Sequence, residues 1–530
     1  MKKKILVLLL VFVSILVYGQ NVEVGGLQSG VWDADIVHVV ADVKVVDSLV
    51  VASGTVVLFD GFYSVTVADG ASFKAQGTSS DSIRFTVADT TGFHIYNSGK
   101  GGWNGFHVEK AGKVCFDYCI LEYSKASDTT DMYGGAMKIN YCDDVEISHS
   151  TLRYNGAREH GGAVDAQNSH VVMTNCNVNN NRLFSDDNIY FRYGGALRFL
   201  KCDVEMRVME FSRNYGETSI GGALSLDSCS VVLDRAVFAD NVGLNGGGLY
   251  MMRSNHLPGR LSNLLFDHNF SGHFGGGLAF SDASPEVYNI LVTNNNSEGV
   301  NCPGIFFYQY ASPKLTNCIV YGNYLAPQGI SSDTVQADTV QMWLWTFDDY
   351  APEFRNCLIE GGEKYITNSD YIKVFENIVD ADPLFVDAEH RDFRLSEGSP
   401  CRDAGYEMLP DDLAEGRDLA GSWRVANQRI DIGPYEYTAA SVPVYPDRQH
   451  ARLVGNPLNA QSRVEFDHEM DGELIVAVYS MTGREASRGV FDLGKSTSLE
   501  IGSLTEHLAP GVYLIVVKSS QESFTLKAVR

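Results

Sequence analysis

A glycine pair followed by a short apolar run recurs at a nearly fixed interval through the middle of this chain. The copies begin at Gly134, Gly161, Gly194, Gly221, Gly246 and Gly275, and a weakened copy begins at Pro303. Their starts lie 27, 33, 27, 25, 29 and 28 residues apart. A unit this short cannot bury its apolar face alone, so each copy must stack on its neighbours.

A second marker keeps the same period, because an asparagine follows each start by 20 to 23 residues. These asparagines are Asn155, Asn181, Asn214, Asn241, Asn269, Asn295 and Asn323. Alternating apolar runs separate the two markers, with no apolar period of 3.6 residues long enough for a helix. We therefore predict an all-β chain built on a right-handed parallel β-helix. Glycines should form its positive-φ corners, and the asparagines, which tolerate αL backbone, should form an inward ladder bonded from coil to coil.

The paired segments "GGAL…FSRN" and "GGAL…FADN" resemble the repeats of the polymorphic outer-membrane-protein family of bacterial surface β-helices, over 134–323. Flanking segments alternate in the same way, so we expect a lead-in over 20–35 and a β-helix over 36–380, with about 12 coils. An open β-helix end is an exposed sheet edge that needs cover. Residues 381–437, with "DPLFVD" and "RIDIGPYEY", resemble the choice-of-anchor Q domain, which implies a cap there.

The N-terminus carries the pattern of a secretory signal peptide. Lys2, Lys3 and Lys4 precede the apolar run 5–17, and small residues lead to a cleavage point after Gly19. We predict that residues 1–19 are removed and that the rest of the chain is exported.

The C-terminal residues differ in character from the repeats. After a linker over 438–450, residues 451–530 alternate as strands between glycine turns, which predicts a small antiparallel β-sandwich. The segment resembles the C-terminal sorting domain of type IX secretion cargo, through Gly455, Asn456, Pro457, Gly483, Gly511, Tyr513 and Lys527. The resemblance implies the type IX machinery as a partner, and a final location on the cell surface, attached to the outer membrane, or outside the cell. An ordinary accessory sandwich such as a carbohydrate-binding module is the alternative.

Charge and cysteine placement limit the remaining function classes. A net charge of −25 argues against nucleic acid as a partner, since phosphates would be repelled. The ten cysteines fall at small repeat positions, which predicts buried free thiols rather than a disulfide framework. Cys202 and Cys229 are the pair whose stacking would bring them within disulfide range.

Candidate chemistry lies on outward positions and corner loops. One outward position reads Lys138, Asp165 and Arg198 on successive coils, which is either the basic and acidic set of a lyase or a solvated ion-pair ladder. Long loops before Gly134 and Gly194 flank a short loop, so we predict a notch there. Its floor would be Arg158, Glu159 and His160, its walls would include Tyr190 and Phe191, and Asp128, Asp131, Asp186 and Asp187 are candidate Ca²⁺ ligands.

These observations favour an exported, monomeric, non-catalytic β-helix that acts as an adhesin, a glycan binder or another interaction scaffold. Its ligand would be an extracellular polysaccharide or a component of a host or cell surface. The alternative is a polysaccharide lyase or glycoside hydrolase that uses the same face.

Overall fold

The computed structural model forms two compact units, Met1–Ala439 and Ala440–Arg530. It describes residues 21–438 apart from 96, 128–131, 185–191, 299–301, 327–339, 348 and 426–428. In the second unit it describes residues 451–529 apart from 455–457, 460–461, 481–484, 506, 509–511 and 520–522. The predicted signal peptide and most of the predicted linker lie outside the described residues.

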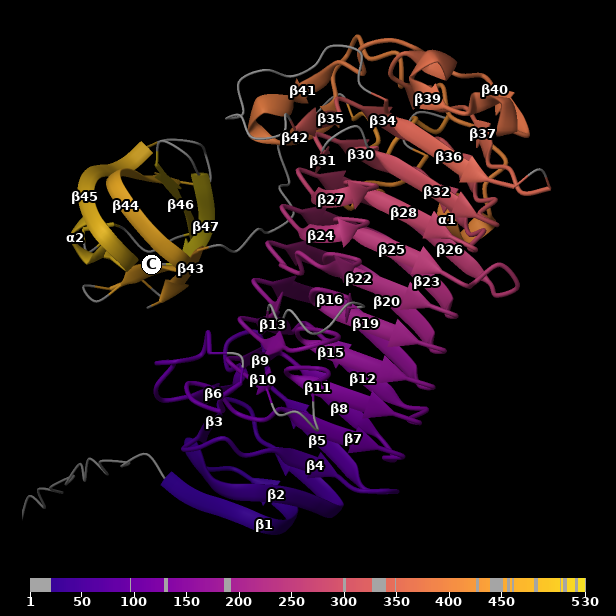
Figure 1. Ribbon diagram of the computed structural model, residues 1–530. Coiled ribbons are helices and arrows are strands. Elements are labelled where there is room, and N and C mark those ends of the chain that lie inside the picture. The colour runs from indigo at the N-terminus through magenta and orange to yellow at the C-terminus, as the bar shows by residue number, and fades with distance from the viewer. Residues whose placement is uncertain are drawn as a thin grey trace, which may run out of the picture. The chain divides into compact units, whose positions relative to one another are not determined.

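The first unit is the predicted parallel β-helix, whose rungs stack from the indigo end to the orange end of Figure 1. The strands that follow the glycine pairs make its first strand row, in which each strand pairs in parallel with the next. The thirteen members are β1 (Asn21–Trp32), β2 (Ile36–Val51), β4 (Val65–Val67), β7 (Phe106–Glu109), β11 (Met137–Asn140), β15 (Val164–Gln167), β19 (Leu197–Leu200), β22 (Leu224–Asp227), β25 (Leu249–Met252), β28 (Leu278–Ser281), β32 (Ile305–Gln309), β36 (Met342–Thr346) and β39 (Ile366–Thr367). Twelve of these rungs fall within 36–370, in agreement with the coil count expected from the repeat period.

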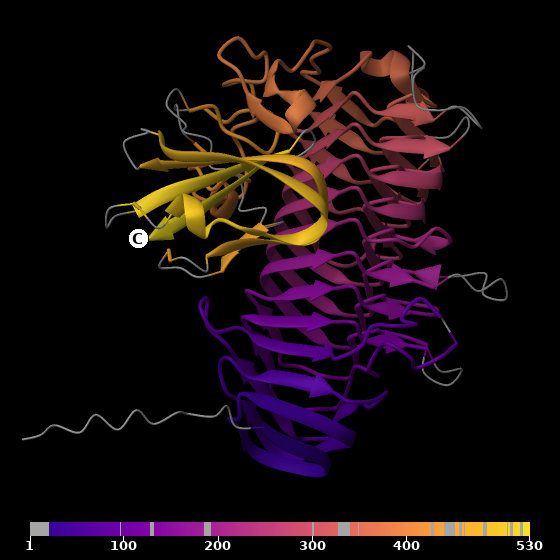
Figure 2. The ribbon, with the colours of Figure 1, turned by 90° about the vertical axis from the view of Figure 1, so that its left-hand side faces the viewer.

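Two further strand rows close each coil. The second row contains β5 (Ser72–Gln76), β8 (Val114–Asp117), β12 (Val145–Ser148), the first parts of β16 (His170–Asn179), β20 (Asp203–Ser212), β23 (Ser230–Ala239) and β26 (Gly259–Asp267), then β29 (Glu286–Tyr288), β33 (Lys314–Thr316), β37 (Glu353–Arg355) and β40 (Val374–Glu376). The third row contains β3 (Val56–Phe59), β6 (Ile83–Val87), β9 (Cys119–Glu122), β13 (Thr151–Arg153), the second parts of the same four long strands, β30 (Leu291–Thr293), β34 (Ile319–Tyr321) and β38 (Leu358–Ile359). Figure 2 shows these rows from the side.

Shorter strands line the corner between the asparagines and the next glycine pair. One set is β10 (Lys125–Ala126), β14 (Gly156–Ala157) and β17 (Arg182–Leu183). The other set, which we call the corner row, is β18 (Arg192–Tyr193), β21 (Ser219–Ile220), β24 (Val242–Asn245), β27 (Phe270–Phe274), β31 (Asn296–Glu298) and β35 (Tyr324–Ala326). The repeat alignment did not predict these strands, and they decide what the outer face exposes.

The interior is a stack of like side chains. Phe211, Phe238 and Phe266, three residues before ladder asparagines, stack with ring centroids 4.6 and 4.7 Å apart. All three are fully buried. The aromatic residue of the repeat therefore serves the core, where stacked rings add to the gain from burial.

Each glycine of a pair is required for a different reason. Gly194 has a φ of 66°, as expected for a positive-φ corner. Gly195 has no such φ, but a Cβ on it would lie 1.9 Å from the carbonyl oxygen of Gly222 on the next coil. The second glycine is therefore fixed by close backbone contact between coils rather than by a corner.

The ladder asparagines do not use the αL backbone that the sequence analysis associated with them. The ladder asparagines do not have positive φ; the residue before each one does, as with Asp240 at 58° and His268 at 54°. The αL residue turns the chain so that the following side chain points inward. The αL position before each ladder asparagine is exposed or half-buried and is filled by several residue types. It therefore carries no sequence signature.

Residues 381–437 form an irregular segment with β41 (Phe385–Asp387), β42 (Asp392–Leu395) and α1 (Asp411–Ala414). Three 3₁₀ turns lie nearby, at Gly362–Tyr365, Ser369–Tyr371 and Ala388–His390. Apolar residues of the segment, including Phe393 and Ile432, pack on outward side chains of the third row from Val237 to Leu358. We call residues 381–437 the side segment, because these contacts lie along the side of the β-helix rather than over its last coil.

The second unit is antiparallel, as predicted. Its strands are β43 (Ala451–Val454), β44 (Arg463–Ser480), β45 (Glu485–Glu500), β46 (Val512–Lys518) and β47 (Ser523–Val529), with α2 (Gly502–Thr505). They enclose a separate core that includes Leu474, Val476 and Ile515. Tyr513 is a buried member of β46 and Lys527 lies in β47, whereas Gly455, Asn456, Pro457, Gly483 and Gly511 lie outside the described residues.

Candidate functional site

The register stacks the outward residues that the glycine alignment pointed to. Lys138 pairs with Asp165 and Asp165 with Arg198, and the column continues through Ser225, Tyr250, Ala279, Phe306 and Trp343. We call it the outer column. Its members from Asp165 to Phe306 are buried, and Asp165 has no exposed surface. The idea of a solvated ion-pair ladder is therefore wrong for this part of the column.

The corner row is the reason for this burial. Tyr193, Ile220 and Phe274 come from the corner row and pack against Tyr250, Ala279 and Phe306. The chain thus builds a small second core outside the coil, in the angle between the corner row and the first strand row. The strands of the corner row that cover this second core are only two to five residues long.

The charges at the start of the outer column are engaged with neighbours. Arg198 Nη1 donates to Asp165 Oδ2 at 2.8 Å, and Gln167 Nε2 donates to Asp165 Oδ1 at 3.0 Å. The ammonium of Lys138 lies 5.4 Å from the ring centroid of Tyr133, and the guanidinium of Arg198 lies 5.9 Å from that of Tyr193. The outer column therefore starts with a buried, aromatic-lined ion pair.

His160 joins the same cluster from the predicted notch floor. Its ring stacks on Tyr133, with centroids 5.0 Å apart and planes 16° apart, and meets Tyr193 edge-on at 5.2 Å. Nδ1 lies 2.8 Å from the carbonyl oxygen of Glu159, so Nδ1 carries the proton and donates. Burial, together with the positive charge of Arg198, lowers the pKa of His160 to about 4. The imidazole is neutral at pH 7, with Nε2 3.6 Å from the Glu159 carboxylate.

The structure thus brings together two groups that the sequence placed separately, the outer column and the notch floor. We call Tyr133, Lys138, Glu159, His160, Asp165, Tyr193 and Arg198 the corner cluster. Arg158 lies half-buried beside it. Tyr190, Phe191, Asp128, Asp131, Asp186 and Asp187 lie outside the described residues, so the notch walls and the Ca²⁺ ligands stay predictions. Among the residues that the structure does describe, no group of three or more His, Cys, Asp or Glu is placed to hold a metal.

The cysteines are all buried free thiols, including Cys202 and Cys229. Cys202 Sγ donates to the carbonyl oxygen of Leu200 at 3.4 Å. On the preceding coil, the Ser169 hydroxyl donates to the carbonyl oxygen of Gln167 at 2.8 Å. Cysteine and serine therefore occupy one turn position and make the same bond to the carbonyl two residues earlier, a structural role rather than a reactive one.

Sequence reasoning missed an aromatic surface on the last coils of the first strand row. Phe306 pairs with Trp343 and Tyr308 with Trp345, and the ring centroids of Tyr310 and Phe347 lie 5.1 Å apart. The signal was present, because aromatic residues alternate in "FFYQY" and in "WLWTF", and a period of two places them on one face of a strand. The glycine marker is weakened at Pro303 and missing before β36, so the alignment stopped before Trp343 and Trp345.

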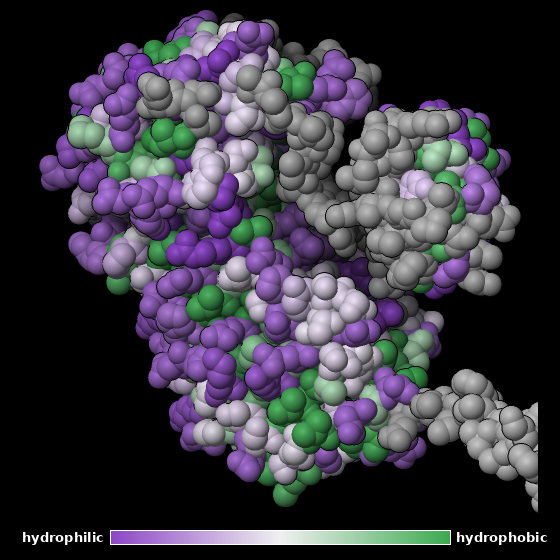
Figure 3. Space-filling view, turned by 180° about the vertical axis from the view of Figure 1, so that it is seen from behind, coloured by the Kyte–Doolittle hydropathy of each residue, from purple (hydrophilic) through white to green (hydrophobic). Residues whose placement is uncertain are grey.

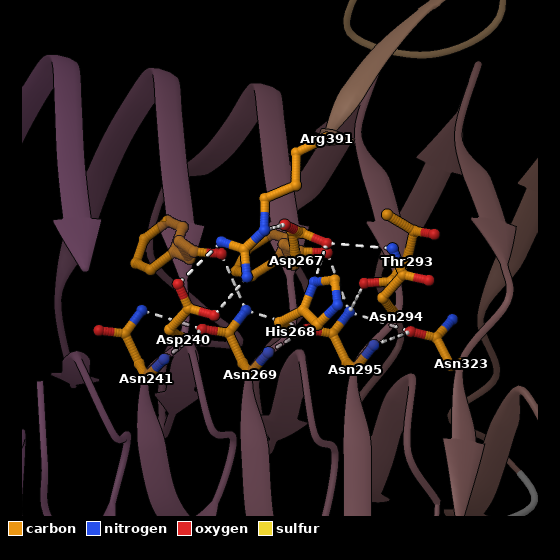
Figure 4. Close-up of polar contacts among 12 residues, drawn as sticks. Asp240, Asn241, Asp267, His268, Asn269, Thr293, Asn294, Asn295, Asn323 and Arg391 are labelled. Atoms are coloured by element: carbon orange, nitrogen blue, oxygen red, sulfur yellow. Dashed lines mark hydrogen bonds and ion pairs between the residues drawn. The ribbon is translucent and has the colours of Figure 1, made fainter. Parts of the chain in front are cut away.

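A polar contact ties the side segment to the β-helix beside the asparagine ladder (Figure 4). Arg391 donates to both oxygens of Asp240, at 2.8 and 2.6 Å, and its Nε lies 3.3 Å from Asp267 Oδ2. His268 Nδ1 lies 2.6 Å from Asp267 Oδ1. Asp267 is fully buried, and the Arg391 contacts outweigh burial in lowering the pKa of Asp240. One guanidinium therefore neutralises carboxylates from two successive coils.

Replacing Arg391 by methionine is expected to destabilise the docking of the side segment by about 2 kcal/mol, because two carboxylates lose their shared cation. Hydrogen exchange of residues 381–437 should become faster than in the unchanged protein. Arg402→Met, in the same segment but without an ion pair to the β-helix among the described contacts, is the control. Equal exchange in both variants would contradict the assignment.

Comparison with known families supports the fold and its handedness. A family model described as a right handed beta helix region matches residues 78–258. Together with the parallel strand rows, this match defines the first unit as a right-handed parallel β-helix, a scaffold of a general kind. No curated protein matches the chain in sequence. No helix among the described residues is long and apolar enough to cross a membrane.

Proposed function

We propose that this protein is an exported binding scaffold that holds a glycan along the outer face of its first strand row, without cleaving it. The signal-peptide pattern of residues 1–19 and the sorting-domain resemblance of residues 451–530 support export and display on, or release from, the cell surface. Viewed from behind, hydrophilic residues cover most of the described surface of the β-helix (Figure 3), as suits a monomeric rod in water.

The observation that carries this proposal is the state of the candidate catalytic groups. Asp165 is fully buried and bonded to Arg198, whose own side chain is 9% exposed. A lyase base must reach a sugar carbon, and a general acid must reach a glycosidic oxygen. Neither member of this pair has that access, so the charges at this corner stabilise the fold.

The alternative of a polysaccharide lyase or hydrolase would have to use His160 as its base. His160 is neutral, its Nε2 is free of a proton, and Glu159 and Arg198 lie close to it. A pKa of about 4 makes this imidazole a weak base at neutral pH, which lowers its value for proton abstraction.

A polysaccharide panel separates the two functions. The full exported chain is incubated with acidic and neutral polymers, with and without Ca²⁺, while unsaturated-product absorbance and reducing ends are followed. We expect binding to at least one polymer in affinity gels and no product above the blank. Product that disappears in His160→Ala would establish the enzyme instead. Polymer binding that needs Ca²⁺ and is lost in the Asp186→Ala/Asp187→Ala variant would establish the predicted metal site.

A further inference from the structure

The aromatic surface on β32 and β36 rises from the second core into solvent. We call Phe306, Tyr308, Tyr310, Trp343, Trp345 and Phe347 the aromatic platform. Along β32 and the residue that follows it, the side chains change from buried at Phe306, through half-buried at Tyr308, to 43% exposed at Tyr310. Along β36 they change from half-buried at Trp343 to 52% exposed at both Trp345 and Phe347. The buried end anchors the platform and the open end presents ring surface.

Ring contacts hold the platform in one arrangement. Phe306 stacks on Phe274 of the corner row at 4.5 Å, and Trp343 and Trp345 lie 6.3 Å apart with planes 15° apart. Tyr310 also meets Tyr350, with ring centroids 5.0 Å apart. A side chain with so many ring neighbours loses little further freedom when a ligand binds, which favours affinity.

The chemistry around the open end fits a sugar better than a protein. An amide and a carboxylate group border the exposed rings. Asn255 donates through Nδ2 to the Tyr310 carbonyl oxygen at 2.8 Å and contacts the Asp282 carboxylate. Pyranose rings combine a flat face of C–H groups with hydroxyls at the rim. Aromatic rings flanked by hydrogen-bonding groups match that combination.

The charge of this region disfavours an anionic polymer. None of the platform residues is basic, and Asp282 lies beside them. Arg253, which follows β25 on this face, is paired with Asp227. A polymer rich in uronic acids or sulfates would meet carboxylates and a chain of net charge −25.

We propose that the open end of the aromatic platform, formed by Tyr310, Trp345 and Phe347, binds an uncharged polysaccharide by stacking against its sugar rings. This inference rests on the proposed function and adds the site and the class of glycan. It assigns the ligand to the last coils of the first strand row rather than to the corner cluster.

The test compares affinity electrophoresis of the full exported chain in gels that contain mixed-linkage β-glucan, xylan, galactomannan or polygalacturonate. We expect retardation by at least one of the three neutral polymers. Trp345→Ala/Phe347→Ala should weaken it about tenfold or more, the effect typical of losing central aromatic contacts. Trp345→Phe, which keeps a ring, should retain most of the affinity.

Two controls make the result specific. Trp423→Ala removes a tryptophan that is 58% exposed in the side segment, away from the platform, and should bind as the unchanged protein does. Thermal unfolding of each variant shows that it is folded. Retention of binding by the double variant, or binding to polygalacturonate alone, would overturn the platform while leaving the proposed function in place. No binding to any polymer would overturn both.

Discussion

Replacing Asn241 by alanine is expected to lower the free energy of unfolding of the β-helix by about 3–5 kcal/mol, because it breaks the ladder at its middle. Asn241 Nδ2 donates to the Phe211 carbonyl oxygen and to Asn269 Oδ1, both at 2.9 Å. Its Oδ1 accepts from the backbone N–H and Nδ2 of Asn214, at 3.0 and 2.9 Å. Alanine removes all four bonds and leaves the Asn214 N–H without a partner in the core.

Chemical denaturation, followed by circular dichroism, measures this loss as a lower midpoint. Asn177→Ala is the matched control, since Asn177 lies in β16, two coils before Asn241, but is half-buried and points outward. We expect its effect to stay within about 0.5 kcal/mol, as for most surface changes. Equal denaturation midpoints for the two variants would show that a ladder asparagine stabilises the β-helix no more than an asparagine on its surface.

The ladder shows what a repeat can and cannot predict. Its seven asparagines follow from spacing alone, but its ends do not. Ser124 Oγ donates to Asn155 Oδ1 at 2.7 Å, and Asn323 Nδ2 donates to Gln341 Oε1 at 2.8 Å. Gln341 follows Asn323 by only 18 residues, and Ser124 is not an amide, so neither fits the pattern. Each end position has a ladder asparagine on one side only, and Gln341 meets that neighbour with both ends of its amide, because its Nε2 also donates to the Asn323 carbonyl oxygen at 3.0 Å.

The sequence predicts which residues of the candidate site share a column, but not what packs against that column. Period-two alternation and the glycine register place Lys138, Asp165 and Arg198 in one column. The burial of the column from Arg198 onward depends on Tyr193, Ile220 and Phe274, which belong to short corner strands that no periodicity marks. The contact between Arg391 and Asp240 spans 151 residues, so no local pattern encodes it. Sequence reasoning found the coil and its faces, and missed what packs against them from outside the repeat.

Replacing Arg424 by methionine is expected to destabilise the side segment by about 3–5 kcal/mol, because a fully buried cation is the partner of several buried groups. Arg424 Nε donates to Glu436 Oε1 at 2.9 Å, and Nη1 donates to Asn263 Oδ1 of β26 at 2.8 Å. Both Nη atoms also donate to the Gly433 carbonyl oxygen. Methionine fills much of the volume but pairs with none of these oxygens.

The pH dependence of this loss is the signature of the pair. Burial raises the pKa of Glu436 from 4.5 to about 8, although Arg424 opposes the shift, and burial also raises the pKa values of Asp418 and Asp431. Between pH 4.5 and about pH 8, Glu436 of the native protein keeps a proton that the unfolded chain has released. Stability is therefore fully present below about pH 4.5 and falls as pH rises through about 8. Without Arg424 the main group that opposes the raised pKa of Glu436 is gone, so the variant should lose most stability at alkaline pH.

Thermal unfolding at about pH 6 and about pH 9, with hydrogen exchange of residues 381–437, measures this prediction. Glu436→Gln should flatten the pH dependence, because an amide does not titrate, while keeping an oxygen for Arg424. Glu407→Gln is the control, since that carboxylate lies in the same segment, is 62% exposed and pairs with Arg429 on the surface. An equal loss at both pH values in Arg424→Met would mean that Arg424 acts through packing alone. The buried charges would then have no part in how the segment is held to the β-helix.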